Sequence, residues 1–328
     1  MGVRYVASRL VTAGVTIGLI VVLNFVLFRM MPGSPERLLL GRMPGVSANV
    51  LETTRERWGL DKPLFPDQFV AYVSATFQGD LGFSYAARGR PVTDVIAQRI
   101  GPTVLLFGLG EVVAIFLGLA LGAWSGWKRG GLIDHVGNGV SLILYSTPYF
   151  LLGMGLMIVF ATGLGWFPTY GMRDVGRVYP GPLEELLDMA RHLVLPLATV
   201  SLGLIGQYAI VMRSSIVETL SEDYITTARA KGLKDGRVLR SHALPNALLP
   251  TVTLIAINLG YVVAGAITVE VVFNWPGLGT LTVDALASRD YPVLQGVFLL
   301  LSVAVVLANL VADLAYGLLD PRIGRAHV

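Results

Sequence analysis

Long apolar runs without charges alternate with short polar stretches along this chain of 328 residues. A helix rises about 1.5 Å per residue, so the ~30 Å hydrocarbon core of a bilayer needs roughly 20 apolar residues. Six runs reach this length, the second interrupted only by Glu111 and the third ending near Gly163: Leu10–Phe28, Ile100–Trp127, Val136–Met172, Leu193–Met212, Ala243–Val269 and Tyr291–Ala312. The pattern predicts an all-α polytopic membrane protein with six transmembrane helices.

The composition agrees with a membrane protein. Hydrophobic residues make up 54% of the chain and charged residues 14%, whereas soluble domains carry roughly 25% charged residues. Arg4 and Arg9 precede the first run, as in a secretory signal peptide, but the run is too long and no small-residue cleavage site follows it. We interpret this run as an uncleaved first transmembrane helix. Cysteine is absent, which excludes disulfide and thiol chemistry and leaves the redox compartment open.

The distribution of Lys and Arg predicts that both termini lie in the cytoplasm. The short outer loops then hold four basic residues (Arg173, Arg177, Arg191, Arg289), and the inner segments hold twelve: Arg4, Arg9, Lys128, Arg129, Arg213, Arg229, Lys231, Lys234, Arg237, Arg240, Arg322 and Arg325. The remaining nine lie in a long outer segment, which counts little toward orientation. Trp124 and Trp127 at one membrane face, and Trp166 and Trp275 at the other, suit interfacial aromatic belts.

The six runs divide the chain into four predicted parts. These are a cytoplasmic N-terminus with the first helix (1–30), an extracytoplasmic segment (31–99), a five-helix core with a cytoplasmic loop at 213–250 (100–317), and a cytoplasmic tail (318–328). In the extracytoplasmic segment, residues 48–60 and 66–79 have the pattern of short amphipathic helices, which form either a cap or a docking surface. Gly118, Gly122 and Gly126 lie four apart in the second span, a spacing that allows close helix packing.

The polar stretch Asp223–Pro250 is the only predicted cytoplasmic segment longer than a turn. Asp223 is placed to cap a first helix, and Gly232 to follow that helix in a left-handed conformation. Asp235 is placed to cap a second short helix, which Pro245 ends or kinks. The stretch therefore predicts a helix, a glycine corner and a second helix.

Two alanines give the first of these helices a narrow profile. Ala228 and Ala230 leave it slim enough to enter a groove on a partner. A basic inner loop that only obeys the positive-inside rule is the alternative, and it leaves the placement of alanine and glycine unexplained.

This stretch resembles the EAA loop of ABC-importer permeases, whose pattern is Glu-Ala-Ala, three residues, Gly, nine residues and Ile-x-Leu-Pro. Thr226, Thr227 and Ala228 hold the first three positions, Gly232 the glycine, and His242–Pro245 the last four. The threonines and the histidine depart from the general pattern and resemble the dipeptide/oligopeptide branch, in which "TARAKGL" and a following "HAL.NALLP" are usual.

Further segments along nearly the whole chain resemble the same branch. They are "RERWGLDKPL" at Arg55–Leu64, "GDLGFSY" at Gly79–Tyr85, "PV" at Pro91–Val92, "STPYF" at Ser146–Phe150, "GWFPTYG" at Gly165–Gly171, "VEVVFNWPGLG" at Val269–Gly279, "RDYP" at Arg289–Pro292 and "LDPRI" at Leu319–Ile323. In this order and spacing they resemble the B-type permease subunit of a dipeptide/oligopeptide ABC importer.

The resemblance implies a type I ABC-importer permease fold in a bacterial inner membrane, with a helical extracytoplasmic insertion after the first helix. It implies a homologous C-type permease subunit, two ATPase subunits, an extracytoplasmic substrate-binding protein and a peptide substrate as partners, and no nucleic acid. The EAA loop would lie in a groove on one ATPase subunit, with Ala228 and Ala230 at the closest approach. The implied coupling residues are Thr226, Thr227, Ala228, Arg229, Ala230, Lys231, Gly232 and Leu233.

The chain has no phosphate-binding loop of its own. Such a loop places Gly directly before its Lys, but Lys62, Lys128, Lys231 and Lys234 follow Asp, Trp, Ala and Leu. The four histidines are scattered and form no H-E-x-x-H motif, which disfavours a membrane-embedded enzyme. We predict that the chain is not an enzyme and binds no cofactor or metal, and that ATP and Mg²⁺ bind the partner ATPase subunits.

The other transport classes stay open at this point. A secondary transporter or channel for a small polar solute is one alternative, and the same permease role for a nickel chelate, glutathione or a sugar is another. Glu111, near the predicted midplane, either lines the translocation path or forms a hydrogen bond between helices. Glu270, Tyr145 and Pro148 are further candidates for the path or a gate.

Overall fold

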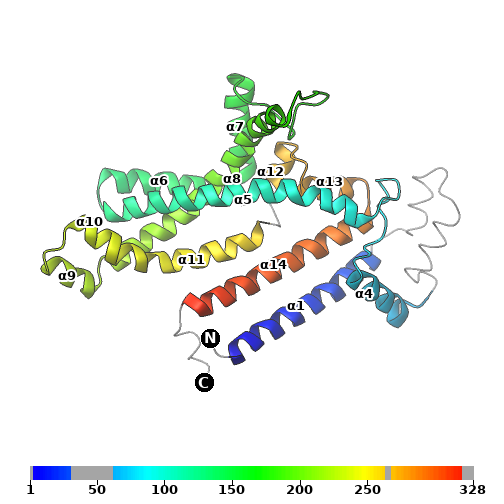
Figure 1. Cartoon of the computed structure of the whole chain (residues 1–328), viewed down its shortest axis with the longest axis horizontal. Helices are drawn as coiled ribbons and strands as arrows, with labels where there is room; N and C mark the ends of the chain where they lie inside the picture. Colours follow the sequence, from blue (N-terminus) through cyan, green and yellow to red (C-terminus); the bar gives the residue numbers. More distant parts are fainter. Residues whose placement is uncertain (1–2, 31–61, 263–266, 320–328) are drawn as a thin grey trace. The chain divides into compact units, whose positions relative to one another are not determined.

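The computed structural model describes residues 3–30, 62–262 and 267–319 (Figure 1). The predicted helix at residues 48–60 lies outside these ranges. The α-helices are α1 (Val3–Met30), α4 (Phe69–Phe77), α5 (Val92–Trp127), α6 (Leu132–Ser146), α7 (Tyr149–Leu156), α8 (Pro182–Thr219), α9 (Asp223–Ala230), α10 (Asp235–Val238), α11 (Leu244–Tyr261), α12 (Ile267–Val272), α13 (Leu278–Ala287) and α14 (Tyr291–Leu319). Short π-helical segments at Leu64–Gln68, Met157–Gly163 and Leu239–Ala243 precede α4, follow α7 and precede α11.

Among the described residues, five continuous helical segments are long and apolar enough to cross a membrane. They are Arg4–Arg29, Val92–Trp127, Pro182–Thr219, Asp235–Leu259 and Tyr291–Leu314. The bent pair of α6 and α7 would make a sixth span. The prediction of an all-helical membrane protein is confirmed.

Two helices are longer than the apolar runs that predicted them. The second run began at Ile100, whereas α5 begins at Val92 and includes the charged Asp94 and Arg99. With 38 residues, α8 is about 57 Å long and exceeds the bilayer core. A helix does not have to end where its apolar run ends, because its backbone hydrogen bonds are equally well made in water.

The predicted third span is a pair of helices rather than one continuous helix. α6 and α7 meet at an angle of 104°. Thr147 has the extended conformation (φ −84°, ψ 123°) that a residue before proline favours, and Pro148 (φ −57°, ψ 138°) precedes the first turn of α7. The apolar run is uninterrupted here, so hydrophobicity alone did not reveal the break.

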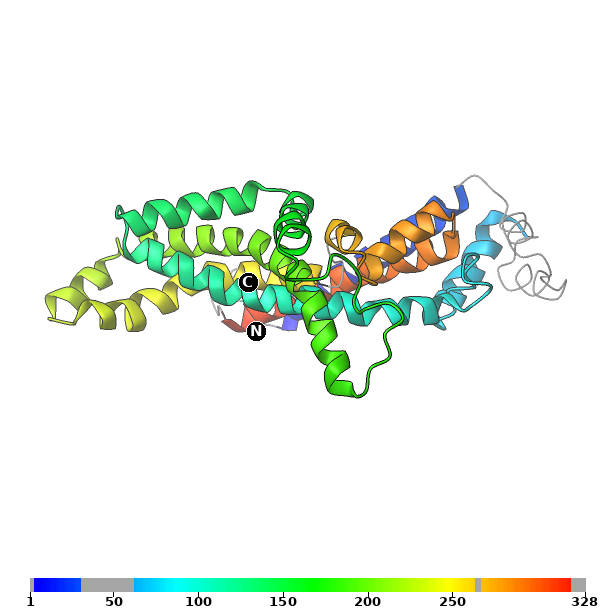
Figure 2. The ribbon, with the colours of Figure 1, turned by 90° about the horizontal axis from the view of Figure 1, so that it is seen from above.

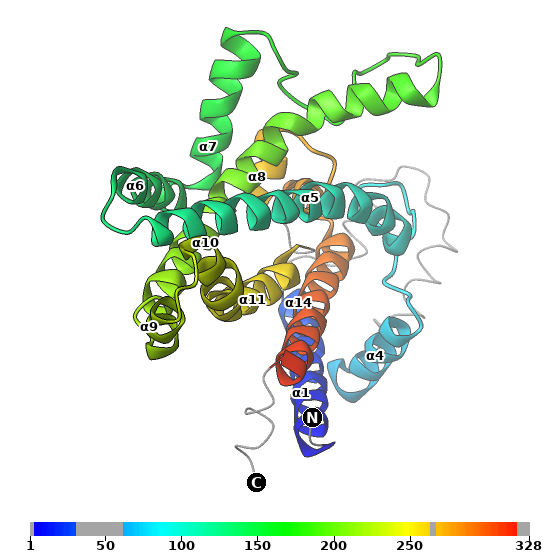
Figure 3. The same ribbon diagram turned by 60° about the vertical axis from the view of Figure 1, so that its left-hand side comes forward.

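The chain forms two compact units, residues 1–102 with 276–328 and residues 103–275. In the first, α1 and α14 lie side by side and antiparallel (Figures 1 and 3). Near one end the hydroxyl of Tyr5 donates to the carbonyl of Asp313, at 2.9 Å. Near the other, Asn24 Nδ2 donates to the carbonyl of Gln295, at 3.1 Å. These bonds between polar side chains and backbone fix the register of two otherwise apolar helices.

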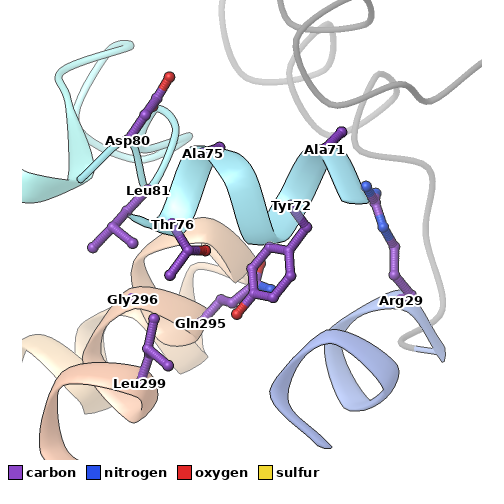
Figure 4. Close-up of a pocket in the computed structure, with 10 residues that line it drawn as sticks. All are labelled: Arg29, Ala71, Tyr72, Ala75, Thr76, Asp80, Leu81, Gln295, Gly296 and Leu299. Atoms are coloured by element: carbon purple, nitrogen blue, oxygen red, sulfur yellow. The ribbon is translucent and has the colours of Figure 1, made fainter. Parts of the chain in front are cut away.

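α4 covers the end of this helix pair. The rings of Phe25, Phe65, Phe69 and Tyr72 form an aromatic cluster with centroid separations of 5.3 to 5.5 Å. A small pocket beside the cluster is lined by residues of α1, α4 and α14, and Figure 4 shows Tyr72 pointing toward Gln295. The prediction of a helix within residues 66–79 is confirmed, and these contacts anchor it to the first unit.

Asp290, in the "RDYP" segment just before α14, holds the turn that follows α4. Its carboxylate accepts hydrogen bonds from Ser84 Oγ, the Tyr85 N–H and the Ala86 N–H. Asp290 is 1% exposed, so these bonds replace the water that the buried charge has lost.

In the second unit, α5, α6 and α11 pack around α8 (Figures 1 and 2). A Cβ added at Gly118 would lie 2.6 Å from Cβ of Tyr208, and one added at Gly126 would lie 2.8 Å from Cβ of Ile216. Gly122 is equally crowded by Ala209 and Met212. The glycine face of α5 is therefore a helix-packing surface, as its spacing predicts.

One residue assigned to an aromatic belt is not available to a membrane interface. Trp124 and Trp166 are 59% and 57% exposed, and their place in a belt stays a prediction. Trp275 is 0% exposed and lies in the core of the second unit with Phe273, Leu193 and Val269. The assignment of Trp275 to a belt is wrong, because tertiary packing encloses its indole completely.

Candidate functional site

The EAA-like stretch forms the predicted helix, corner and helix (Figure 3). α9 is closed by hydrogen bonds from the N–H of Gly232 to the carbonyl of Arg229 (2.9 Å) and from the N–H of Leu233 to that of Ala228 (3.4 Å). Gly232 has φ +78°, which a residue with a Cβ rarely adopts. The prediction of a left-handed glycine at this corner is confirmed.

Three details of the stretch differ from the prediction. Asp223 and Asp235 are the first residues of α9 and α10 rather than their caps, since Glu222 and Lys234 precede the helices and neither start has a side-chain capping bond. Both carboxylates still lie at the positive end of a helix dipole. Pro245 neither ends nor kinks the second helix. It lies in the first turn of α11, directly after the π-helical segment Leu239–Ala243, and the helical segment continues through it to Leu259.

Ala228 faces the interior of its own chain. It is 5% exposed and lies in a cluster with Met212 and Ile216 of α8, Ile225 of α9 and Ala247 of α11. Its predicted place at the closest approach to an ATPase subunit is therefore wrong. Its small size has another reason: it allows α9 to lie against α8 and α11 without overpacking.

The opposite side of α9 is open. Thr226, Thr227, Arg229 and Ala230 are exposed, as are Lys231 and Gly232 at the corner, while Leu233 is half-buried against the Ala228 cluster. Arg229 Nε lies 3.8 Å from Asp235 Oδ1, and both side chains are largely exposed, so this pair stabilises the loop little. The open side thus presents two hydroxyls, a methyl group and two cations.

Tyr224 on the same helix is uncharged at physiological pH. Burial and the nearby Glu222 carboxylate raise the pKa of its phenol.

An ion pair anchors the end of α8 that leads into α9. Arg213 Nη2 lies 2.8 Å from Asp134 Oδ2 on α6, and its Nε bonds the other carboxylate oxygen. The N–H of Gly130 also donates to Oδ2, at 2.9 Å. Asp134 is 2% exposed. The sequence reasoning missed this pair, because Asp134 and Arg213 are far apart in the chain and each resembles an ordinary loop charge.

Glu111 lies in a polar cluster between α5, α8 and α11. The hydroxyl of Tyr208 donates to its carboxyl group, and Asn258 Nδ2 donates to the Tyr208 oxygen at 3.0 Å and to Gln207 Oε1 at 3.3 Å. Glu111 and Tyr208 are 2% and 0% exposed. This arrangement favours a hydrogen bond between helices over a place on a water-filled path.

The other three path candidates come from α12 and from the α6–α7 bend. Glu270 on α12 is buried and accepts a hydrogen bond from Thr103 Oγ1, at 2.7 Å. Tyr145 and Pro148 are exposed at the α6–α7 bend. Their roles in a path or gate stay predictions.

Comparison with known proteins decides the family. Residues 118–325 match the family described as "Binding-protein-dependent transport system inner membrane component". This chain belongs to that family. Residues 2–106 of the permease match the N-terminal part of binding-protein-dependent transport system membrane components.

Two relatives match this permease over almost their whole length. A protein named as a peptide permease from Brucella suis biovar 1 is 38% identical over 320 residues, which is 98% of each chain. The glutathione transport system permease protein GsiC of Escherichia coli K12 is 40% identical over 320 residues, again 98% of each chain. The resemblance stated from the sequence motifs is confirmed.

A solved structure shows the fold. A chain of the inward-facing MetNI methionine ABC transporter aligns with a TM-score of 0.55 and 18% identity, over 69% of this permease and 96% of that chain. The permease is therefore an inner-membrane, multi-pass component of a binding-protein-dependent ABC transport system, and it is a transport component rather than an enzyme. Membership in such a system implies ATPase and binding-protein partners.

Proposed function

We propose that this permease forms part of an importer for peptides, with glutathione, itself a tripeptide, as the second candidate substrate. The names of relatives that match almost the entire chain at 38% and 40% identity carry the proposal. The permease pairs with a homologous C-type subunit, and two ATPase subunits supply ATP hydrolysis. An extracytoplasmic binding protein delivers the substrate and largely determines selectivity.

Uptake into proteoliposomes tests the substrate. The complete transporter, reconstituted with its own binding protein and ATP inside the vesicles, is given a labelled tripeptide or labelled glutathione. ATP-dependent accumulation of either substrate supports the proposal and ranks the two candidates. Accumulation of neither, from a complex that hydrolyses ATP and takes up a sugar or a nickel chelate, overturns it.

The exposed side of α9 is the contact we propose for an ATPase subunit. Ile225 and Ala228 hold the helix against α8 and α11 on one side, which leaves Thr226, Thr227 and Ala230 to enter the groove. Because α9 is packed against α8, a displacement of α9 by the ATPase subunit also displaces α8. A loop without such contacts would change its own conformation instead. The motion of the ATPase thus reaches the membrane helices through the Ala228 cluster.

Crosslinking tests this placement directly. The chain has no cysteine, so a single introduced cysteine is the only thiol of this subunit and carries a photo-crosslinker at one defined position when the subunit is labelled before assembly. Ala230→Cys should crosslink to the ATPase subunit. Two matched positions should not: Ala228→Cys on the buried side of the same helix, and Val175→Cys, which is 91% exposed in a loop predicted to be extracytoplasmic. A crosslink from Val175, or none from position 226, 227 or 230, would place the coupling contact elsewhere.

The same variants test the proposed orientation, with both termini in the cytoplasm. With the permease expressed without its ATPase subunits, so that position 230 is uncovered, a membrane-impermeant maleimide should label Val175→Cys in intact cells and Ala230→Cys only after the membrane is opened. The reverse result would invert the topology.

A further inference from the structure

Three side chains with metal-binding atoms meet where the loop after α7 lies against the first turns of α8. Asp174 comes from the loop, and Asp188 and His192 lie one helical turn apart on α8. One ligand atom of each lies within 4.8 Å of the others. Asp174 and His192 also line an open hollow together with Tyr170 and Arg177. No sequence motif revealed this group, because the loop returns Asp174 to α8 only in the folded chain.

His192 is oriented as metal-binding histidines are. Its Nδ1 lies 2.9 Å from the carbonyl oxygen of Asp188, an atom that can only accept, so Nδ1 carries the proton. With the proton on Nδ1, Nε2 is the ring atom that can offer a lone pair to a metal ion. A backbone carbonyl that holds the other nitrogen is the usual support for a histidine ligand.

The Nε2 atom lacks a hydrogen-bond partner within the described chain. Its nearest charged neighbour is Asp174 Oδ1 at 3.7 Å, which is beyond hydrogen-bonding distance. The His192 side chain is only 2% exposed, yet the residue lines the hollow. A buried acceptor that faces a polar hollow is suited to bind a ligand there.

The two carboxylates differ in how firmly they are held. Asp188 Oδ2 accepts hydrogen bonds from the Tyr179 hydroxyl, at 2.5 Å, and from the Asp174 N–H, at 2.9 Å. These bonds leave Oδ1 as the oxygen available to a cation. Asp174 is largely exposed on the loop and can adjust its position. In a tetrahedral site with bonds of about 2.1 Å, ligand atoms are about 3.4 Å apart, so a shift of at most about 1.4 Å from the present spacing closes the set.

A cation of the chain already lies beside these carboxylates. Arg177 Nη1 is 3.0 Å from Asp174 Oδ2 and 3.7 Å from Asp188 Oδ1. Its side chain is 50% exposed, and it projects from the same loop as Asp174. The guanidinium can therefore leave without disturbing α8, and it acts as a competitor that an incoming ion must displace.

We propose that Asp174, Asp188 and His192 bind one divalent transition-metal ion in competition with Arg177. One imidazole and two carboxylates form a ligand set that suits Zn²⁺ and Co²⁺ better than Ca²⁺ or Mg²⁺, which prefer oxygen ligands alone. Water completes the coordination from the hollow. The ion ties the loop of residues 164–181 to α8 and so sets the shape of a surface that we expect to face the binding protein.

Metal titration of the full-length chain, purified in detergent and freed of metal, tests the proposal. Co²⁺ is the spectroscopic probe, because its visible bands report coordination by nitrogen and oxygen, and Zn²⁺ should displace it with a stoichiometry of one. Asp174→Asn and His192→Gln should each weaken binding by at least roughly tenfold. His135→Gln, which alters an exposed histidine outside the group, should bind as the wild type does.

Arg177→Gln should have the opposite effect and tighten metal binding. Removing one positive charge about 4 Å from a divalent ion should tighten binding by roughly thirtyfold even at the dielectric constant of water. Because Asp174 and Arg177 are exposed, neither of their variants should alter folding, which gel filtration verifies. The proposal is overturned if the wild type and Arg177→Gln show no saturable binding. It is equally overturned if Asp174→Asn binds Co²⁺ as tightly as the wild type.

Discussion

The hydroxyl of Tyr208 on α8 donates a hydrogen bond to the carboxyl group of Glu111 on α5, and both side chains are almost completely buried. A polar group buried in the interior of a membrane protein costs much free energy unless it is hydrogen-bonded. The bond between these two side chains offsets that cost for both. The Glu111 cluster therefore joins α5 and α8 at the level where α5 is otherwise apolar.

Removing the phenol should destabilise this helix pair. Tyr208→Phe leaves both Glu111 and Asn258 without the oxygen they contact, at a cost of about 1–3 kcal/mol. Glu111→Gln should stay near the wild type, since an amide oxygen also accepts from the phenol. Thermal unfolding of the purified chain measures both variants, and a Tyr208→Phe protein as stable as the wild type would contradict the packing role.

Transport by Glu111→Gln separates the two roles considered for this residue. If Glu111 only joins helices, the ratio of cationic to anionic peptide uptake in proteoliposomes should match that of the wild type. A change in that ratio, at unchanged subunit levels, would place the carboxylate on the path.

The ion pair of Asp134 with Arg213 should contribute more to the free energy of unfolding than a surface ion pair does. Breaking a buried pair costs about 3–5 kcal/mol, and the partial exposure of Arg213 puts Asp134→Asn at or below the lower end. Arg229→Gln, which breaks the exposed pair with Asp235, is the control and should change stability by less than about 0.5 kcal/mol. Equal unfolding temperatures for the two variants would show that the Asp134 pair contributes no more than a surface contact.

Two glycines of α5 should respond oppositely to the same substitution. A methyl group at Gly122 meets the backbone of Ala209, so Gly122→Ala should cost about 1–3 kcal/mol. A methyl group at Gly108 has no neighbour within 4 Å, and Gly108→Ala should gain up to about 1 kcal/mol from helix propensity. The comparison is made by thermal unfolding. Destabilisation of the same size in both variants would mean that the close approach to α8 is not the reason for the glycine.

Gly232 should tolerate asparagine better than valine. Open space surrounds its Cβ position, so only the backbone angle of φ +78° restricts the side chain. Asparagine adopts this conformation far more readily than a β-branched residue. Peptide uptake should therefore fall more in Gly232→Val than in Gly232→Asn, with both proteins present in the membrane at wild-type levels. Equal uptake by the two variants would argue against a requirement for the left-handed corner.

The isolated permease should neither bind nor hydrolyse ATP, since none of its four lysines follows a glycine as a phosphate-binding loop requires. Equilibrium binding of a fluorescent ATP analogue to the purified chain measures this. Saturable binding that persists when copurifying ATPases carry inactivating substitutions would contradict it.

The sequence by itself determined the class of protein and the glycine corner, and it placed an apolar run on each of the five continuous helical segments, among the described residues, that are long enough to cross a membrane. These features depend on local properties: the length of an apolar run against the thickness of a bilayer, and the backbone angles that only glycine reaches easily. The family motifs could also be recognised from the sequence, because they are contiguous segments. The ends of helices were harder to predict, since α5 and α8 both extend beyond their apolar runs.

Only the tertiary structure decided which side of each element faces inward. Ala228 and Ala230 are equivalent in the sequence, yet the cluster of Met212, Ile216 and Ile225 buries the first and leaves the second exposed. Asp174 and His192 likewise meet only because the loop after α7 folds back onto α8. Burial and contact between distant residues are properties of the packed helices, and neither is encoded in the spacing of residues along one segment.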